Sequence, residues 1–321
     1  MESSKKYRIG IDLGGTNIKT GILDENGTIL LKSSTPTGAQ REWQQVADDI
    51  IASVKNLMEQ MNISFDDCVG IGMGCPGTID SQNGIVVYSN NFNNWKNLPM
   101  VEYLHAALPL PIRISNDANC AALGECVAGA AKEYSSAVMI TLGTGVGGGV
   151  VWNGKLFEGG PGGVELGHTV IETNGKPCSC GRKGCFEAYA SANALIRDAV
   201  AAAKAHPESS LNQLCDGNLD NMNGKIPFDA AQAGDPVAQE VINEYIRMLG
   251  EGIANMVNIF RPEVVLLSGG VCAQGENLTV PLNAYLNEHA YGAQYNPTPP
   301  VKIAQVGNDA GLIGAAFLVQ Q

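Results

Sequence analysis

Residues 165–187 contain one histidine and three cysteines at spacings that suit a single metal ion, with a glutamate at each end of the segment. The four candidate ligands are His168, Cys178, Cys180 and Cys185. One imidazole and three thiolates form the closed ligand set that zinc takes in structural sites. Reduced thiols in a plain turn are the alternative, but packing rarely explains three cysteines so close together. The sequence therefore predicts a structural zinc ion that orders this loop and presents Glu165 and Glu187.

Composition favours a cytoplasmic enzyme with two domains of ordinary size. The chain has 321 residues, a formal net charge of -12 and nine cysteines, an odd number that argues against a disulfide framework. No cluster of Lys and Arg marks a nucleic-acid surface, and no long apolar run predicts a membrane segment. An acidic protein can still bind polyphosphate through backbone amides and Mg²⁺, which requires glycine-rich loops.

The first such loop follows the apolar residues 7–13. The chain turns at Gly14, Gly15 and Thr16 and returns as residues 18–23, which predicts a β-hairpin, and residues 28–32 add a third strand. Glycines let amide groups approach a phosphate closely, and Asp12 is placed to hold Mg²⁺ directly or through water. A plain connection between strands is the alternative for this turn alone.

A second segment repeats this plan. Residues 137–142 predict a strand, residues 143–149 a Gly/Thr turn, residues 150–152 and 155–157 two more strands. The chain thus looks duplicated, with two phosphate-type hairpins about 130 residues apart. Three glycines also match the dinucleotide fingerprint, but that fingerprint requires a helix at the loop, whereas this loop leads into a strand. No Walker motif is present.

Two further turns have a local and a functional interpretation. The Ser268-Gly269-Gly270 turn follows a buried strand and precedes a predicted helix, which suits either a nucleotide's ribose and α-phosphate or a plain connection. The polar run 115–119 follows a predicted strand and begins an alanine-rich helix. One helix cap needs only one such side chain, so the run indicates a site with Asp117 as a candidate general base.

The remaining segments are predicted to be scaffold. Residues 41–61, 237–260 and 309–319 have the pattern of helices, and residues 69–73 that of a buried strand. The asparagine-rich residues 90–97 surround Trp95 and suit pocket lining and exposed surface about equally.

Taken together, these motifs resemble the ROK family of sugar kinases, within the actin-like ATPase superfamily, and especially its bacterial zinc-containing glucokinases. The resemblance covers almost the whole chain. It is carried by these segments: Asp12-Leu-Gly-Gly-Thr16, Asn116-Asp117, Gly143-Thr-Gly145, Glu165-Leu-Gly-His168, Cys178-Ser-Cys180-Gly-Arg-Lys-Gly-Cys185-Phe-Glu187 and Ser268-Gly-Gly270. Family members often have Pro-Asn-Leu where this chain has Asn90-Asn91-Phe92.

The resemblance implies an α/β fold of two ribonuclease-H-like domains around a central cleft. The smaller domain would hold residues 1–118 with the C-terminal helix 309–321 returning to it, and the larger domain residues 119–308. It also implies that Asp117 is the catalytic base. Implied sugar contacts are Gly77, Asn91, Asn116, Asp117, Glu165, His168 and Glu187, with His168 also bound to zinc. Implied nucleotide contacts are Asp12, Gly14, Gly15, Thr16, Asn17, Thr141, Gly143, Thr144, Gly145, Gly269 and Gly270.

The implied activity is transfer of the γ-phosphoryl group of ATP to the C6 hydroxyl of glucose, with Mg²⁺ and a structural zinc as cofactors. Kinases of the same family that act on N-acetylmannosamine, allose or fructose are the alternatives. Sugar-responsive repressors share most motifs but carry an N-terminal DNA-binding domain, whereas six residues precede the first strand of this chain. The expected partners are sugar and ATP, with no nucleic acid or membrane, in a homodimer or homotetramer.

Overall fold

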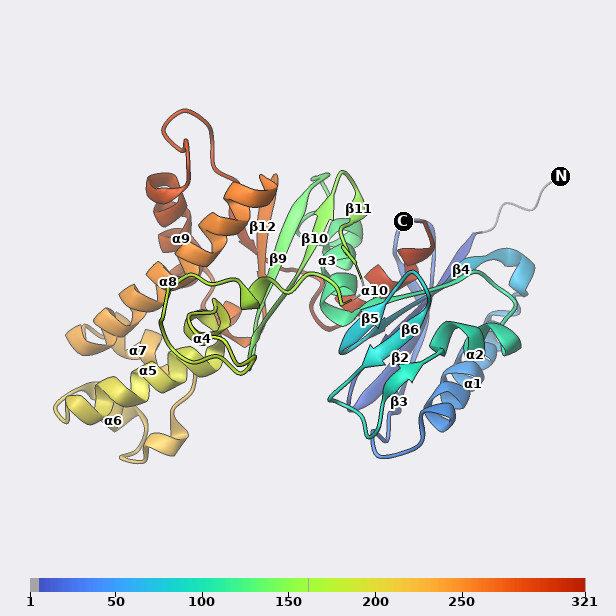
Figure 1. Ribbon diagram of the computed structural model, residues 1–321, viewed down its shortest axis with the longest axis horizontal. Helices are drawn as coiled ribbons and strands as arrows, with labels where there is room; N and C mark the ends of the chain where they lie inside the picture. The colour runs from blue at the N-terminus through green and yellow to red at the C-terminus, as the bar shows by residue number, and fades with distance from the viewer. Residues whose placement is uncertain (1–5, 161, 321) are drawn as a thin grey trace. The chain divides into compact units, whose positions relative to one another are not determined.

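The computed structural model describes residues 6–160 and 162–320 (Figure 1). The chain forms two compact units, each made of several segments. Unit 1 comprises Met1–Ala137, Gly149–Val164 and Ala304–Gln321, and unit 2 comprises Val138–Gly148 and Glu165–Ile303. This division places residues 119–137 in unit 1, and the expected domain boundary at residue 118 stays a prediction. Within the described residues, no helix has the length and apolar character that a membrane span requires.

The main sheet of unit 1 has five strands in the order β3-β2-β1-β4-β8. Their bounds are β1 (Tyr7–Leu13), β2 (Asn17–Leu23), β3 (Ile29–Pro36), β4 (Cys68–Cys75) and β8 (Ile112–Asn116). The first three form the expected antiparallel meander, while β4 pairs in parallel with β1 and with β8. Since β1, β4 and β8 run in parallel, their carboxyl ends meet at one edge of the sheet, where ligand sites of α/β proteins open.

Two helices, α1 (Trp43–Met61) and α2 (Met100–Ala107), cover one face of this sheet (Figure 1). Alternate residues of β1 point to this face, and Ile9, Ile11 and Leu13 are completely buried against the apolar sides of both helices. Burial of several such side chains supplies the main stabilisation of the unit. The alternation therefore leaves Asp12 on the opposite face.

The opposite face of the sheet contains glycines, which let two helices pack directly on the backbone of the strands. The two helices are α3 (Asp117–Ala128) and α10 (Ala310–Ala316). Helix α10 lies between the short 3-10 turns Gly307–Asp309 and Leu318–Gln320. A methyl group at Gly10 would overlap the carbonyl oxygen of Leu312, and one at Gly72 would overlap that of Ala315. The C-terminal helix is thus an integral layer of the N-terminal sheet.

A smaller sheet in unit 1 carries the asparagine-rich loop. It consists of β5 (Thr78–Asp80), β6 (Ile85–Tyr88) and β7 (Lys96–Leu98) in that order. The rings of Phe92 and Trp95 stack at 4.1 Å between centroids and are buried, whereas Asn91 is exposed. The loop is therefore anchored by its aromatic residues and keeps the Asn91 amide available for a ligand.

The second five-stranded sheet has the order β11-β10-β9-β12-β13. Its strands are β9 (Ala137–Leu142), β10 (Val146–Trp152), β11 (Lys155–Leu156), β12 (Val264–Ser268) and β13 (Val301–Ile303). The expectation that residues 143–149 form the turn was wrong, because β10 begins at Val146 and includes three glycines. Packing explains these glycines, since a methyl group at Gly148 would overlap the carbonyl oxygen of Met139.

The helices of unit 2 gather around the long helix α8 (Figure 1). Their bounds are α4 (Glu187–Ala190), α5 (Ala192–Ala205), α6 (Ser210–Leu214), α7 (Ile226–Gln232), α8 (Pro236–Phe260) and α9 (Glu276–His289). The start of α8 follows from its sequence, because Pro236 occupies the first turn and the Asp235 carboxylate accepts the amides of Val237 and Ala238. This long helix supports α4, which carries Glu187.

Candidate active site

Asp12, at the carboxyl end of β1, forms an ion pair with Lys19 and packs against helix α10. Lys19 lies directly opposite it in the hairpin, and Lys19 Nζ is 3.0 Å from Asp12 Oδ2. The same ammonium donates to the backbone carbonyl of Asn308, at 2.6 Å. On the other side, a Cβ at Gly311 of α10 would lie 3.2 Å from Asp12 Oδ1. A carboxylate fixed in this way suits Mg²⁺, either directly or through water.

The glycine turn after Asp12 is fixed by its own backbone and by the buried Thr37. The Gly14 amide donates to the Asn17 carbonyl at 2.9 Å. The Thr37 amide donates to the Thr16 carbonyl at 2.8 Å, and the Thr37 hydroxyl to the Gly14 carbonyl at 2.7 Å. Thr16 and Asn17 are exposed at the tip. The turn is therefore preorganised, and the role of Thr37 was not predicted from the sequence.

The structure brings several predicted sugar-binding residues of unit 1 together. Asn116 caps α3 by accepting the Ala118 amide at 2.8 Å, and its Nδ2 donates to the Gly77 carbonyl at 3.1 Å. Asn91 lies close to the glycine turn after Asp12, because a Cβ at Gly15 would be 3.6 Å from Asn91 Nδ2. The capping interpretation of Asn116 is thus correct, and it fixes the start of the helix at Asp117.

Asp117 is the first residue of α3 and has the electrostatics of a proton acceptor. Burial raises the pKa of its carboxyl, and the negative charge of Asp12 raises this pKa further, while the Ala118 amide opposes the rise. The residue still has exposed surface, so a substrate can reach it. A carboxylate with a raised pKa is a stronger base than an ordinary aspartate.

A hydrogen bond that the sequence did not predict ties the end of β8 to the glycine-rich segment after β11. The completely buried Ser115 hydroxyl donates to Glu158 Oε1. The Asn119 amide donates in turn to Ser115 Oγ at 3.4 Å. The side chains of the polar run 115–119 therefore have different roles. Ser115 and Asn119 anchor the neighbouring segment, and Asp117 remains available for chemistry.

In unit 2 the glycine turn between β9 and β10 is close to Glu187. The Gly143 amide donates to the Gly145 carbonyl at 3.0 Å, which closes the turn and leaves Thr144 exposed. Glu187 Oε2 accepts the Val146 amide at 3.1 Å, and a methyl group at Gly145 would overlap the same oxygen. Glu187, predicted from the sequence as a sugar contact, thus also borders the second hairpin.

The third predicted glycine turn contains Gly269 and Gly270. Gly269 is closely packed, whereas Gly270 borders open space. A methyl group at Gly269 would overlap the carbonyl oxygen of Leu142, at the end of the strand that carries Thr141, and Gly269 has a φ of 100°. A Cβ at Gly270 would meet nothing within 4 Å. The tight approach of β12 to β9 therefore explains Gly269, while Gly270 leaves room beside the turn.

The predicted metal ligands converge in the segment 168–185, which we call the zinc loop. The four ligand atoms of His168, Cys178, Cys180 and Cys185 lie within 4.8 Å of one another. Cys180 Sγ and Cys185 Sγ are 3.6 Å apart, as are Cys178 Sγ and His168 Nδ1. Ligands about 2.3 Å from a tetrahedral ion are about 3.8 Å apart, whereas disulfide sulfurs are about 2.05 Å apart. The donor set therefore fits zinc.

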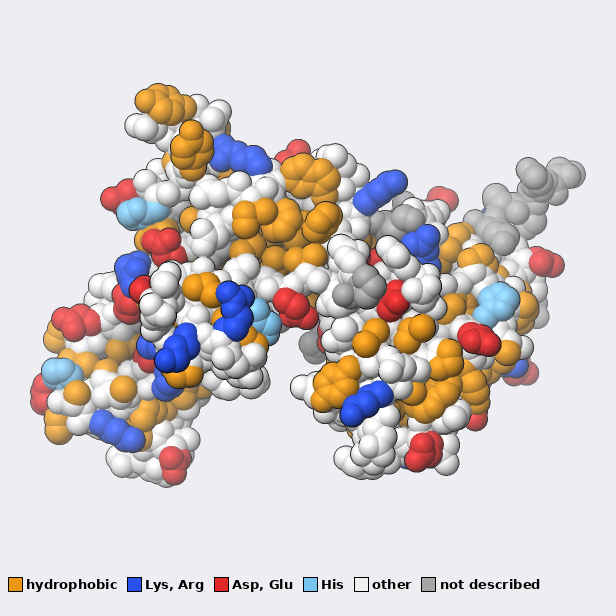
Figure 2. Space-filling model, in the orientation of Figure 1, with side chains coloured by type: hydrophobic (Ala, Val, Ile, Leu, Met, Phe, Trp, Pro, Cys, Tyr) orange, Lys and Arg blue, Asp and Glu red, His pale blue; other side chains and the backbone are white. Residues whose placement is uncertain are grey.

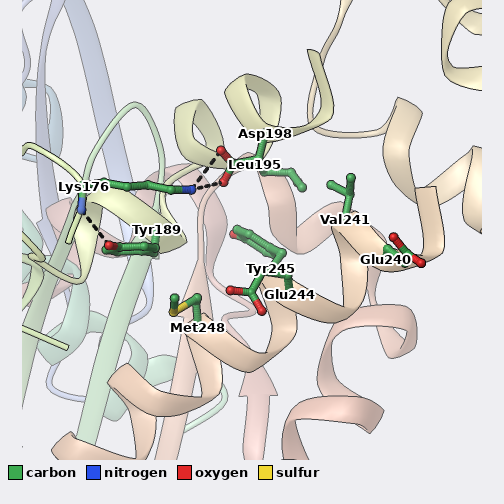
Figure 3. A pocket seen from close by; sticks show the side chains of 9 residues that line it. All are labelled: Lys176, Tyr189, Leu195, Asp198, Glu240, Val241, Glu244, Tyr245 and Met248. Atoms are coloured by element: carbon green, nitrogen blue, oxygen red, sulfur yellow. Dashed lines mark hydrogen bonds and ion pairs between the residues drawn. The ribbon is translucent and has the colours of Figure 1, made fainter. Parts of the chain in front are cut away.

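Contacts outside the metal set attach the zinc loop to the helices behind it (Figure 3). The Lys176 amide donates to the Tyr189 hydroxyl at 2.7 Å, and Lys176 Nζ pairs with Asp198 of α5 at 2.8 Å. Tyr245 of α8 donates to the Ala190 carbonyl at 2.8 Å. These residues border a cavity of about 360 Å³. None of the predicted sugar or nucleotide contacts lines it, so we regard the contacts as support for α4.

The predicted residues fall into two sets, one in each unit. Unit 1 holds the Asp12 turn, Gly77, Asn91 and the Asn116-Asp117 pair, and unit 2 holds the glycine turn between β9 and β10, the zinc loop and Glu165. Glu165 begins the 3-10 turn Leu166–His168, and its carbonyl accepts the His168 amide at 3.1 Å. Each set is assembled within its own unit from segments that are distant in sequence.

Comparison with known proteins agrees with this geometry. The model of the ROK family matches residues 8–321. The chain belongs to the ROK family. A glucokinase of Halalkalibacterium halodurans is 37% identical over 325 residues, which cover 99% of this chain and 96% of the relative.

The chain is also similar to solved structures of ROK proteins and to transcription repressors. A ROK family glucokinase from Streptomyces griseus, solved with glucose and AMPPNP, is 36% identical with a TM-score of 0.75, covering 98% of this chain and 99% of that one. A xylose repressor of Caldicellulosiruptor bescii is 28% identical, and the match covers 97% of this chain but 77% of the repressor. The predicted fold class is confirmed as the two-domain α/β fold of ROK sugar kinases.

Proposed function

We propose that this protein is an ATP-dependent glucokinase that phosphorylates the C6 hydroxyl of glucose. The observation that carries the proposal is the nearly full-length similarity to a ROK glucokinase solved with glucose and AMPPNP. The local geometry supports it, because a carboxylate with a raised pKa, two glycine hairpins and a Cys/His cluster are all present. Kinases acting on N-acetylmannosamine, allose or fructose remain the alternatives within the family.

In this proposal Asp117 accepts the proton of the C6 hydroxyl as that oxygen attacks the γ-phosphorus of ATP and ADP leaves. Phosphoryl transfer needs positioning and charge stabilisation more than covalent help from the protein. Asn116 and Asn91 are proposed to bind sugar hydroxyls, as are Glu165, His168 and Glu187.

The proposed cofactors are Mg²⁺ at Asp12 and zinc in the zinc loop. Mg²⁺ supplies charge neutralisation for the phosphates when it is bound. Zinc would order the loop, since four protein ligands fill its coordination sphere and leave no open position. His168 Nδ1 faces Cys178 in the cluster, so a His168 that binds zinc through Nδ1 can donate its Nε2 hydrogen to a sugar hydroxyl.

The proposal includes a homodimer or homotetramer in the cytoplasm. Hydrophobic side chains are exposed at the tip of the segment between α9 and β13 (Figure 2). Within this segment Tyr291 and Tyr295 are 86% and 82% exposed, and the nearby Ile259 is 65% exposed. Large exposed apolar side chains in one place favour contact with another protein surface. Light scattering of the purified protein measures its oligomeric state directly.

The test is an assay of ADP release with a panel of hexoses, followed by identification of the sugar phosphate. We expect glucose to give the highest kcat/KM. Mannose, allose and N-acetylmannosamine should each lose at least about tenfold, because one inverted or substituted hydroxyl leaves a buried polar group unpaired. A different preferred hexose would correct the sugar but keep the kinase, and no ADP release with any hexose would refute the proposal.

A further inference from the structure

Glu187 contacts two loops of unit 2 through its two carboxylate oxygens. Oε2 accepts the Val146 amide of the second hairpin at 3.1 Å, and Oε1 accepts the Ser179 hydroxyl of the zinc loop at 2.9 Å. Cys178 Sγ also lies 3.8 Å from Oε1. The carboxylate is therefore a direct physical link between the zinc loop and the second hairpin, which are proposed to bind sugar and nucleotide respectively.

We propose that Ser179 is a positioning residue that holds Glu187 against the zinc loop, and that through it the zinc loop affects nucleotide binding as well as sugar binding. This inference rests on the proposed kinase function. Ser179 is not a metal ligand, and no sugar contact is assigned to it. Its hydroxyl donates a hydrogen bond to a charged acceptor, which is stronger than a bond between neutral groups.

The remaining capacity of Glu187 is compatible with a sugar. An ionised carboxylate accepts about four hydrogen bonds, and Ser179 and the Val146 amide use two of these positions. The others stay available for sugar hydroxyls. Ser179 therefore does not compete with the substrate but restricts the directions in which the carboxylate can point.

The negative charge of Glu187 explains how the position of this side chain affects nucleotide binding. The second hairpin is expected to contact phosphates, and Glu187 carries a negative charge beside Gly145. With Ser179 in place, its hydroxyl holds one oxygen of this carboxylate toward the zinc loop. Without the Ser179 hydroxyl, Glu187 gains freedom to approach the phosphate side, and repulsion weakens nucleotide binding.

The test compares Ser179→Ala with the wild-type protein at equal zinc content, measured by elemental analysis. We expect the glucose KM to rise about three- to tenfold, the range of one ordinary hydrogen bond, with kcat nearly unchanged. The Kd for AMPPNP, measured by calorimetry without sugar, should rise about two- to threefold. Ser179→Thr keeps the hydroxyl and should restore both values.

Two controls separate positioning from general damage to the loop. Lys183→Ala removes an exposed side chain from the same loop and should leave zinc content, glucose KM and AMPPNP affinity unchanged. In a Glu187→Gln background, Ser179→Ala should have little further effect, because the two residues act as one unit. Full additivity of the two substitutions would overturn the proposal.

An unchanged AMPPNP affinity in Ser179→Ala would also overturn the proposal, because Ser179 would then serve the sugar side alone. The proposed function has its own readout. If the wild-type protein phosphorylates no hexose, the kinase assignment fails. The calorimetric comparison still decides whether Ser179 and Glu187 connect the two loops.

Discussion

The two glycine hairpins share a plan but obtain their nearby carboxylate in different ways. In the first hairpin, Asp12 belongs to the strand itself and is neutralised by Lys19, its direct partner in the register. In the second, the carboxylate comes from Glu187, which is 41 residues away from Val146 in sequence and attached to the zinc loop. The first hairpin is therefore self-contained with respect to its carboxylate, while the second takes its carboxylate from a separate segment next to the Cys/His cluster.

This difference assigns separate tasks to the two regions. The self-contained hairpin adjoins Asp117, whose pKa it raises through Asp12, so it is suited to the chemical step. The dependent hairpin adjoins the residues proposed to bind sugar, so it is suited to linking the two substrates. The four predictions below test this division in order of decreasing expected effect.

The largest effect should come from Asp117→Asn. We expect kcat to fall about 10²- to 10⁴-fold, the usual contribution of a general base, with the KM values for glucose and ATP changed much less. Folding should be intact, because burial disfavours the charged carboxylate that the amide replaces, and the melting temperature at pH 7 should be equal or higher. Steady-state kinetics and thermal unfolding measure both.

The matched control is Asp66→Asn, which changes an exposed carboxylate of the same unit. It should leave kcat and the melting temperature near the wild-type values. Nearly normal turnover in a folded Asp117→Asn protein would remove Asp117 from the mechanism and, with it, the assignment of chemistry to the first region.

Removal of a zinc ligand tests the dependence of the second region. Cys180→Ser should lose zinc and lower kcat/KM about 10- to 100-fold, since Glu165, His168 and Glu187 lose their ordered support. Cys126→Ser changes a cysteine outside the cluster and should keep both metal and activity. Elemental analysis and kinetics on both variants decide the point. A fully active protein without zinc would contradict the structural role of the metal.

A matched pair of glycine substitutions compares the hairpins directly. Gly145→Ala places a methyl group on Glu187 Oε2, so the KM values for ATP and glucose should both rise about tenfold. At Gly15 the added carbon would meet Asn91 Nδ2 at an ordinary 3.6 Å, so Gly15→Ala should raise mainly the KM for ATP. The same pattern of KM changes in both variants would show that the hairpins are equivalent and that the comparison is wrong.

The smallest effect concerns pH. The proposed reaction needs Asp117 ionised, so kcat/KM should fall as pH drops through the pKa of this residue. Because burial and the charge of Asp12 raise that pKa, the acid limb should lie above about 3.9, the ordinary aspartate value. Salt screens the charge of Asp12 and should move the limb to lower pH. A limb at or below 3.9 in a protein that stays folded would contradict the raised pKa.

The sequence predicted those features that depend on residues close together in the chain. The strand, turn and strand around Asp12 follow from alternation and glycines, and the convergence of the Cys/His cluster follows from the close spacing of its residues. Contacts between distant segments left no such pattern. The Ser115 bond to Glu158 and the Glu187 bond to Val146 span 43 and 41 residues. The glycines of β10 were taken for a loop because their reason, close packing on Met139, exists only in the folded protein.

The packing of α10 on the glycine face of β1 and β4 has a consequence for biosynthesis. Residues 10 and 72 leave the ribosome long before Leu312 and Ala315, whose carbonyl groups complete that face. At about 5 to 20 residues per second, the N-terminal sheet waits on the order of tens of seconds for its covering helix. During synthesis the first unit is thus incomplete, because the glycine positions of β1 and β4 lack the helix that covers them. Its final folding step must follow the synthesis of α10.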